Sequence, residues 1–207
     1  MVRPGGLVVA AVLVVVLSGL GADAEERVLV TLGDSLTAGF GVAQEQAWPA
    51  LVAAHLRREG YAYRVVNAGV SGDTSAGGLR RVGWVLRARP EIVIVALGAN
   101  DGLRGQSVNA MRVNLSEIVA GLRTGGAQVL LAGMRIPPNY GADFTRAFAD
   151  VFPEVARRAR VPFMPFLLDG VAADPGLNQA DGIHPNAAGH RVIAERIWPF
   201  LRPLLRW

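Results

Sequence analysis

Ser35 is the residue whose setting in this sequence most strongly suggests chemistry. It lies in the stretch GDSL at residues 33–36, directly after an apolar run over residues 27–32. An ordinary turn after a buried strand does not need a serine among glycines. A serine that must contact a substrate does need small neighbours of this kind. A serine hydroxyl is a weak nucleophile until a neighbouring base removes its proton. The stretch therefore requires a base elsewhere in the chain.

His184 is the best candidate for that base. The chain has three histidines, and the other two, His55 and His190, lie inside stretches with helical spacing. His184 instead lies in a loop, three residues after Asp181. A carboxylate at this spacing can accept the Nδ1–H of the imidazole, which leaves Nε2 facing the serine. The order Ser35, Asp181, His184 thus predicts a nucleophile, an orienting acid and a base.

Candidate donors for a developing negative charge follow three of the predicted strands. Acyl transfer places charge on the substrate oxygen, and each hydrogen-bond donor aimed at that oxygen is worth about 3–4 kcal/mol. The candidates are the backbone N–H of Ser35, the backbone N–H of Gly72 and the side-chain amide of Asn100. Glycine at position 72 lets a substrate approach the backbone closely. The three residues together predict an oxyanion hole.

Each motif also has an interpretation without chemistry. GDSL alone can be a strand–helix turn capped by its serine, and Asn100 with Asp101 can form a helix cap. Gly72 can be an ordinary turn glycine. Asp181 and His184 can form a loop hydrogen bond or half of a metal site, although the chain has no cysteine and no other suitable histidine to complete one. The catalytic interpretation is favoured because the motifs fall in order at the ends of predicted strands.

Strands and helices alternate along the chain. We expect helices over 44–60, 74–89 with Asp73 as N-cap, 107–123, 144–160 and 186–204, and strands over 27–32, 63–67, 91–97, 128–132 and 161–166. The strand EIVIVAL at 91–97 is apolar almost throughout, which is typical of a strand covered on both faces. This alternation predicts an α/β protein with three layers, α/β/α, and a flavodoxin-like parallel sheet of five strands in the order 2-1-3-4-5. Ligands bind beyond the carboxyl ends of the strands in such sheets.

The first 24 residues have the pattern of an export signal. Arg3 precedes an apolar segment over residues 7–20, which is too short to span a bilayer comfortably, and Ala22-Asp23-Ala24 fits a cleavage site. We therefore expect a signal peptide over 1–24 and one domain over 25–207, exported to the periplasm or secreted, with no stable membrane anchor after cleavage. The alternative is an uncleaved anchor.

Composition excludes several classes of function. The absence of cysteine excludes disulfides, thiol nucleophiles and zinc–thiolate sites. All 21 basic residues are arginines, scattered without interleaved aromatic residues, and the net charge is +4. This pattern indicates a solvated surface rather than a nucleic-acid interface. We expect a monomer with no metal and a small-molecule substrate.

Four blocks of the sequence together resemble the SGNH, or GDSL, hydrolase family. They are GDSL (33–36), the glycine of VSGDTS (70–75), the asparagine of GAND (98–101) and DGIHP (181–185). The resemblance extends over nearly all of the chain after residue 24. The segments AWPALV, VSGDTSAGGLRR, LGANDGLRG and RIPPNYG are most similar to a bacterial periplasmic multifunctional subgroup, variously called acyl-CoA thioesterase, lysophospholipase and arylesterase.

The resemblance implies a serine hydrolase without a cofactor. It implies that Ser35 is the nucleophile, His184 the base and Asp181 the residue that orients it. It also implies that Ser35, Gly72 and Asn100 form the oxyanion hole. The expected substrates are carboxylic esters and thioesters of acyl chains.

The acyl group needs a binding surface, and the apolar, proline-stiffened loop after the fourth strand is the candidate. We expect Ile136, Pro137 and Tyr140 to bind substrate, with Leu103 and Phe40 as neighbours. Alternatively, this loop merely covers the sheet edge. Two other functions remain open from the sequence: a carbohydrate O-acetylesterase with the same catalytic centre, and a non-catalytic acyl-binding or flavodoxin-like module.

Overall fold

The computed structural model describes residues 1–2 and 27–207 of the chain. The predicted signal peptide, residues 1–24, lies outside the described residues apart from its first two positions. The strands are β1 (Arg27–Gly33), β2 (Tyr63–Gly69), β3 (Ile92–Ala96), β4 (Gln128–Ala132) and β5 (Phe163–Met164). The helices are α1 (Ser35–Ala38), α2 (Trp48–Arg58), α3 (Ser75–Leu86), α4 (Ala99–Leu103), α5 (Val108–Thr124), α6 (Ala142–Ala159) and α7 (Ala187–Leu201), and the 3₁₀ turns are η1 (Gln44–Gln46), η2 (Pro138–Tyr140) and η3 (Arg202–Leu204). None of the helices in this part of the chain is long and apolar enough to cross a membrane.

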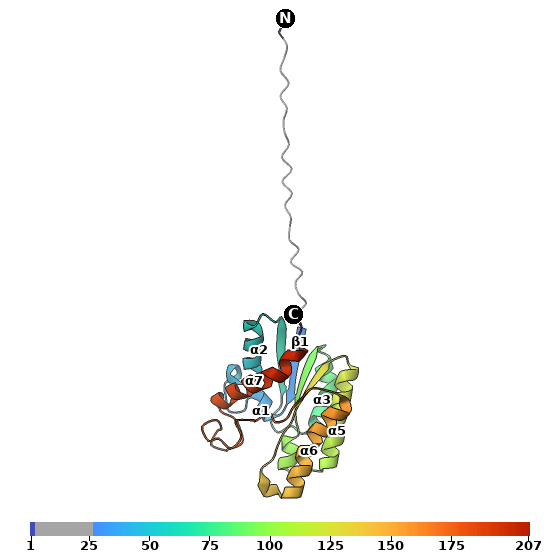
Figure 1. The fold of residues 1–207 in the computed structure, drawn as a ribbon, viewed down its shortest axis with the longest axis vertical. Helices are drawn as coiled ribbons and strands as arrows, with labels where there is room; N and C mark the ends of the chain where they lie inside the picture. The colour runs from blue at the N-terminus through green and yellow to red at the C-terminus, as the bar shows by residue number, and fades with distance from the viewer. Residues whose placement is uncertain (3–26) are drawn as a thin grey trace.

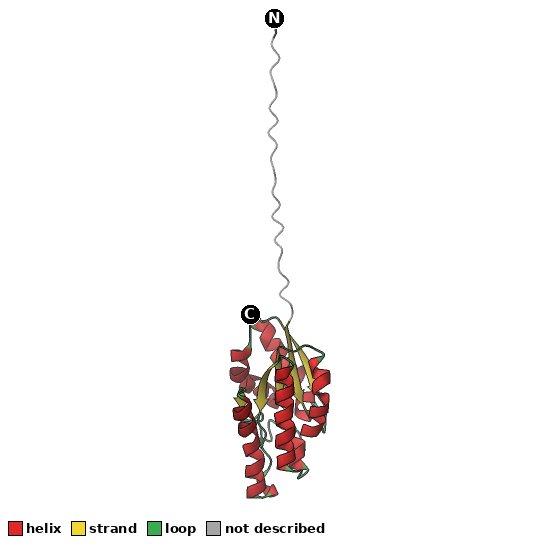
Figure 2. Ribbon diagram, turned by 90° about the vertical axis from the view of Figure 1, so that its right-hand side faces the viewer, coloured by secondary structure: helices red, strands yellow, loops and turns green. Residues whose placement is uncertain are grey.

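The five strands form one parallel sheet in the order β2-β1-β3-β4-β5, which confirms the order predicted from the sequence. Every residue of β3 is buried. A strand that is apolar on both sides needs cover on both faces of its sheet. Figure 2 shows the strands enclosed between helices, so the expected three-layer architecture is present.

Two groups of helices cover the sheet. Helices α2 and α7 pack together on one face, and α3, α5 and α6 pack together on the other (Figure 1). The core between these layers contains Trp48, Phe148 and Phe152 among its largest fully buried side chains. Burying a phenylalanine of this kind contributes about 1.5–3 kcal/mol to folding. The loops at the strand ends therefore start from a well-packed core.

The carboxyl ends of three strands lie side by side. Gly33 at the end of β1 pairs with Gly69 of β2 on one side and with Ala96 of β3 on the other. The chain thus leaves all three strands at the same level, and the following loops start from adjacent points. This is the edge at which parallel sheets bind ligands.

The N-cap of α3 differs from the prediction. Thr74, and not Asp73, caps the helix, because the threonine hydroxyl accepts the N–H of Gly77 at 3.3 Å. The carboxylate of Asp73 instead accepts the Nε–H of Arg81 at 3.0 Å. The acid expected as a cap is therefore part of an ion pair beneath the loop.

Two predicted elements are interrupted or lose most of their residues in the structure. The helix expected over 44–60 divides into η1 and α2, because Ala47 between them has an extended backbone. The strand expected over 161–166 has only two residues. Pro162 and Pro165 flank those two residues, and proline has no N–H to donate to a neighbouring strand.

Candidate active site

Ser35 is the first residue of α1, a helix of four residues that begins just after β1. Its N-cap is Asp34, whose Oδ1 accepts the backbone N–H of Leu36 at 3.0 Å. The helix can lie against the end of β2 because Gly69 has no side chain; a Cβ there would lie 2.2 Å from the backbone nitrogen of Ala38. Since Asp34 is the cap, the hydroxyl of Ser35 is not consumed by capping.

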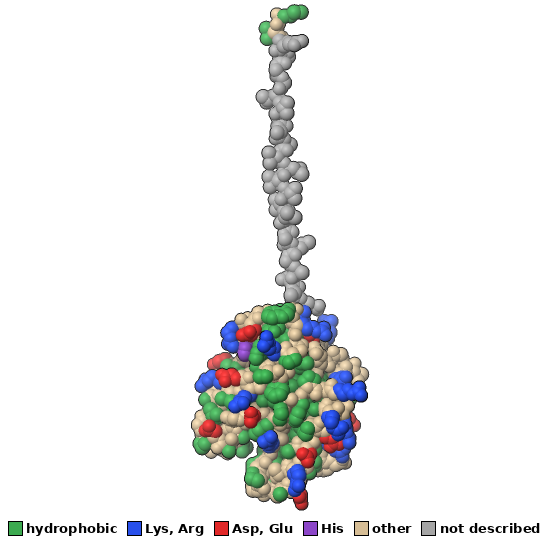
Figure 3. Space-filling view, viewed as in Figure 1, with side chains coloured by type: hydrophobic (Ala, Val, Ile, Leu, Met, Phe, Trp, Pro, Cys, Tyr) green, Lys and Arg blue, Asp and Glu red, His purple; other side chains and the backbone are tan. Residues whose placement is uncertain are grey.

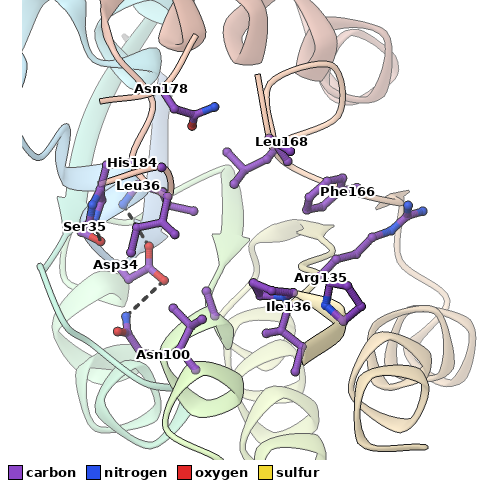
Figure 4. A pocket seen from close by; sticks show the side chains of 18 residues that line it. Asp34, Ser35, Leu36, Asn100, Arg135, Ile136, Phe166, Leu168, Asn178 and His184 are labelled. Atoms are coloured by element: carbon purple, nitrogen blue, oxygen red, sulfur yellow. Dashed lines mark hydrogen bonds between the residues drawn. The ribbon is translucent and has the colours of Figure 1, made fainter. Parts of the chain in front are cut away.

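A chain of two hydrogen bonds joins Asp181, His184 and Ser35. Nε2 of His184 lies 2.9 Å from Oγ of Ser35 (Figure 4), and its Nδ1 lies 2.7 Å from Oδ2 of Asp181. When Nδ1 donates its proton to Asp181, Nε2 is the nitrogen that can accept the proton of the serine hydroxyl. The arrangement can therefore turn this hydroxyl into a nucleophile.

The loop before α7 holds the imidazole through its own backbone. Oδ1 of Asp181 accepts the N–H groups of His184 and Ile183, both at 3.0 Å. The backbone N–H of His184, followed by its ring and by the N–H of Ile183, lowers the pKa of Asp181 from 3.8 to about 2. The ring of Phe40 also packs against the imidazole of His184, with the two ring centroids 4.7 Å apart. The carboxylate thus stays ionised at neutral pH, and the ring is held in place.

Gly72 lies in a tight turn after β2. The N–H of Asp73 donates to the carbonyl of Val70 at 3.0 Å, which closes a β-turn with Ser71 and Gly72 at its centre. Gly72 has a φ of +79°, whereas Ser71 has no positive φ. These angles identify a type II turn, which favours glycine at its third position. Within residues 27–207, the N–H of Gly72 has no hydrogen-bond partner.

Asn100 lies in the first turn of α4, beside this β-turn. Its Nδ2 donates to the carbonyl of Asp73 at 2.9 Å and lies 3.5 Å from Oδ2 of Asp34. Figure 4 shows the amide facing Asp34. The backbone N–H of Ser35 also lacks a partner among the described residues. The segments that carry Ser35, Gly72 and Asn100 therefore meet, and N–H groups gathered in this way can stabilise an oxyanion.

Asp34 is a residue of the site that the sequence did not single out. Its side chain is buried, with 1% of the residue exposed, between the segments of Ser35 and Asn100. Burial raises its pKa from 3.8 to about 6, although the N–H of Leu36 and the nearby His184 partly offset this effect. The sequence feature that could have indicated Asp34 is the position of this acid directly after a buried strand.

A set of buried polar contacts fixes these segments to one another. The carboxylate of Asp101 accepts the N–H of Ser75 at 2.8 Å and its hydroxyl at 2.5 Å. Arg81 donates to the carbonyls of Ala68 at 2.7 Å and Gly33 at 3.3 Å, at the ends of β2 and β1. These hydrogen bonds therefore restrain the loops that carry Ser35 and Gly72. The two contacts of Arg81 join residues 13 and 48 positions apart, and no sequence motif predicts them.

An apolar pocket of about 400 Å³ opens beside Ser35. Ser35 and His184 lie at one end of it, and Phe166 and Arg135 lie at the other (Figure 4). The guanidinium of Arg135 lies 5.1 Å from the centroid of the Phe166 ring. Most of the remaining lining is apolar: Leu36, Ala99, Leu103, Ile136, Pro137, Pro138, Leu168, Ala172, Ala173 and Ile183. Asp34, Asn100 and Asn178 also line the pocket. In the space-filling view, a hollow at the lower left marks this region of the surface (Figure 3).

The loop after β4 contributes two of the three predicted substrate-binding residues to this pocket. Ile136 and Pro137 line it, but Tyr140 is not among the lining residues. The hydroxyl of Tyr140 donates instead to the carbonyl of Leu103 at 2.9 Å, so the tyrosine contacts a residue of the pocket wall. Leu103 lines the pocket as expected, whereas Phe40 packs on His184. The loop thus does more than cover the sheet edge.

The two remaining histidines lie outside the site. The ring of His55 stacks on Trp198 with centroids 3.7 Å apart. His190 is fully buried, and its Nδ1 accepts the backbone N–H of Trp48 at 3.2 Å. Burial lowers the pKa of His190 from 6.5 to about 4. In the described part of the chain, no group of histidine, aspartate and glutamate side chains could hold a metal ion.

Known proteins share both the sequence and the fold. Residues 31–192 match the model of the GDSL-like lipase/acylhydrolase family. An esterase, TesA of Pseudomonas aeruginosa, is 45% identical over 184 residues, which cover 88% of this chain and 92% of that protein. The Escherichia coli protein named thioesterase 1/protease 1/lysophospholipase L1 is 39% identical over 178 residues, covering 86% of this chain and 84% of that protein.

The structural comparison agrees with the sequence comparison. A crystal structure of TesA matches with a TM-score of 0.84 and 45% identity, covering 86% of this chain and 100% of that one. The family model alone spans far more than half of the chain, and the matched range includes Ser35, Gly72, Asn100, Asp181 and His184. The chain therefore belongs to the GDSL-like lipase/acylhydrolase family and is a serine hydrolase that cleaves ester bonds.

Proposed function

We propose that the enzyme hydrolyses esters and thioesters of acyl chains through an acyl-enzyme on Ser35, with His184 as base and Asp181 as the orienting acid. The observation that carries this proposal is the hydrogen-bonded chain from Asp181 to Ser35 at the end of an apolar pocket. A nucleophile placed where an apolar chain can bind is suited to acyl substrates.

The reaction proceeds in two steps. Oγ of Ser35 attacks the carbonyl carbon while Nε2 of His184 takes the hydroxyl proton, and the imidazolium then gives this proton to the leaving alcohol or thiol. Water next attacks the acyl-enzyme and gives a proton to the same nitrogen, which returns it to Oγ as the acid is released. Asp181 holds Nδ1–H throughout and stabilises the imidazolium.

The oxyanion of both steps is bound by the N–H groups of Ser35 and Gly72 and by the amide of Asn100. This assignment is supported by the two unpaired backbone N–H groups, among the described residues, and by the place of Asn100 beside both of their segments. The amide of Asn100 keeps one N–H on the carbonyl of Asp73, and the other, which makes only a 3.5 Å contact with Asp34, is the one that would turn to the oxyanion. Each such donor typically contributes about 2.7–4 kcal/mol to the lowering of the barrier.

The substrate is a small molecule with an apolar acyl chain, of the arylesterase, thioesterase or lysophospholipase type. The apolar lining around Ile136 and Pro137 favours such a chain over the acetyl group of a carbohydrate ester. The names of the relatives, esterase and thioesterase/lysophospholipase, agree with this class. We further propose that the enzyme acts as an exported monomer after removal of residues 1–24, which the mass of the secreted chain and its elution volume would test.

The decisive experiment compares wild type, Ser35→Ala and the distant control Ser116→Ala. Hydrolysis of nitrophenyl esters should fall by about 10³-fold or more in Ser35→Ala and stay unchanged in Ser116→Ala. A nitrophenyl alkylphosphonate, which loses nitrophenolate as Oγ bonds to phosphorus, should add one phosphonyl group to wild type and to the control, and none to Ser35→Ala. Retention of most esterase activity in Ser35→Ala would show that another residue is the nucleophile.

A further inference from the structure

Arg135 places a positive charge at the end of the apolar pocket that lies away from the nucleophile. It belongs to the loop after β4, and with Phe166 it forms the end opposite Ser35 and His184 (Figure 4). Among the described residues of the lining, Arg135 alone has a side chain with a permanent positive charge. A chain that starts at Ser35 and follows the apolar lining therefore reaches a guanidinium at its distal end.

The guanidinium of Arg135 is exposed and has no acceptor in the part of the chain that the structure describes. It lies over the ring of Phe166, 5.1 Å from the centroid, but no carboxylate or carbonyl oxygen of the described residues pairs with it. The carboxylate of the lining, that of Asp34, lies at the nucleophile end (Figure 4). Asp169, three residues after Phe166, pairs instead with Arg196 at 3.4 Å. The positive charge at the distal end is thus not neutralised by these acids.

A comparison with Arg27 shows which partner Arg135 lacks. Arg27 also lies over an aromatic ring, that of Tyr63 at 6.0 Å from the centroid, and it binds the carboxylate of Glu91 at 3.1 Å. Arg135 has the aromatic contact without the carboxylate. A guanidinium on an aromatic face keeps the N–H groups along its edge, and these bind a carboxylate in pairs. The edge of Arg135 can therefore bind an anionic group of a molecule in the pocket.

We propose that the distal end of the pocket is an anion subsite, in which Arg135 binds a carboxylate at the end of the acyl chain. The preferred substrates are then esters and thioesters of dicarboxylic acids that keep one carboxyl group free. This proposal rests on the proposed function, in which the acyl chain occupies the pocket. The apolar lining binds the methylene groups, and the exposed guanidinium lets the carboxylate keep part of its water, so its desolvation costs little.

The test compares matched pairs of nitrophenyl esters. One member of each pair is the half-ester of adipic, suberic, sebacic or dodecanedioic acid, with a free distal carboxylate, and in the other member a methyl ester caps this carboxylate. With wild type, the ratio of kcat/KM for the charged member to that for the capped member should be highest at one chain length. A shorter chain would leave its carboxylate within the apolar lining, where its desolvation is unfavourable.

Arg135→Gln should remove this preference. At the best chain length, kcat/KM for the charged member should fall about 10-fold, mostly through KM, because a distal group binds equally in the ground state and the transition state. The capped member should change less than twofold. Raising the salt concentration should lower the preference of wild type and leave that of the variant unchanged, because salt screens an exposed ion pair.

Arg135→Glu separates a charge effect from local damage to the pocket. In this variant, an ester whose chain ends in a trimethylammonium group should be hydrolysed in preference to the carboxylate ester of the same length, which is the reverse of the wild-type order. A pocket that was merely distorted would lose activity on both substrates alike, and that result would contradict the proposal.

Arg27→Gln is the matched control. Arg27 begins β1, and at about 3.3 Å per residue it lies about 20 Å from Gly33, the end of the strand beside the site. The variant removes one positive charge from an aromatic face, as Arg135→Gln does, and should leave the ratio of charged to capped ester unchanged. An equal loss of preference in both variants would mean that net charge sets the preference, and the proposal would be wrong.

Two further results would overturn the anion subsite and leave the proposed function intact. The first is that no chain length favours the charged member, or that Arg135→Gln affects both members equally. The second is an Arg135-dependent preference for an anionic leaving group on a neutral acyl chain, which would place the leaving group in the pocket. The proposed function itself would instead be refuted by an inactive wild type or an active Ser35→Ala.

Discussion

Replacing Asp34 by asparagine should change how the stability of the fold depends on pH. Burial raises the pKa of Asp34 from 3.8 to about 6 in the folded protein. Between these values the unfolded chain has already lost the proton that the folded chain still holds. At Asp34 the folded state therefore binds more protons, and the contribution of this residue to stability falls as pH rises through this window.

The size of the effect follows from the shift. About two pKa units at 1.36 kcal/mol each correspond to about 3 kcal/mol, lost between pH 4 and pH 7. The amide of the Asp34→Asn variant would keep an oxygen to accept the N–H of Leu36, so the cap of α1 should survive. The variant should therefore gain about 3 kcal/mol relative to wild type over this range.

Urea unfolding followed by circular dichroism at pH 4, 5, 6 and 7 measures this difference. The comparison is made between proteins at each pH, because buried His190 gives both of them a slope of the opposite sign. Asp143→Asn is the control: that carboxylate is fully exposed in a surface ion pair with Arg146, and its removal should change little at any pH. A difference between Asp34→Asn and wild type that stays constant within about 1 kcal/mol, against the shift expected from the pKa, would refute the reasoning.

Three further predictions concern the site and its support. Asn100→Ala should lower kcat by about 10²–10³ with little change in KM, since an oxyanion donor acts in the transition state, and a loss under threefold would reduce Asn100 to a structural role. His190→Gln should remove the contribution by which His190 lowers stability as pH falls from 6.5 to 4, because the folded state holds this histidine neutral down to about 4 while the unfolded chain is protonated; a stability difference between variant and wild type that stays constant over this range in urea titrations would contradict this. Ala172→Phe, at an exposed position of the pocket wall, should lower kcat/KM for decanoyl esters about 10-fold more than for acetyl esters, and equal losses would place the acyl chain elsewhere.

The sheet could be predicted because its signal is local and repeated. Ile92–Ala96 is apolar on both sides, and the segments that alternate with it have helical periodicity, so parallel pairing with right-handed crossovers followed. The end of the sheet was harder to predict. The residues around β5 have strand-like composition, but Pro162 and Pro165 restrict the pairing to two residues. The hydrophobic pattern does not show where proline removes an N–H group that strand pairing requires.

The residues that meet at the candidate active site could be predicted because each lies near a strand end or in a short motif. Ser35 and Asn100 lie in the short segments that follow β1 and β3, and the spacing of Asp181 and His184 brings the carboxylate to the ring within one loop. The residues that hold them could not be predicted. Arg104 and Arg81 bind backbone carbonyls up to 48 positions away, and any exposed arginine has the same sequence signature.

The hydroxyl of Ser35 is free to contact His184 because the buried side chain of Asp34 caps α1. A helix that begins at Ser35 needs a cap, and serine is itself a good capping residue, so an uncapped start would tend to draw the hydroxyl to the backbone. Asp34 takes that role through its bond to the N–H of Leu36, which leaves Oγ of Ser35 to His184. The carboxyl is then buried, and its raised pKa measures the stability lost by placing it there. A change that removed this buried acid without preserving the cap, such as Asp34→Ala, should therefore reduce turnover even though it relieves the cost of burial.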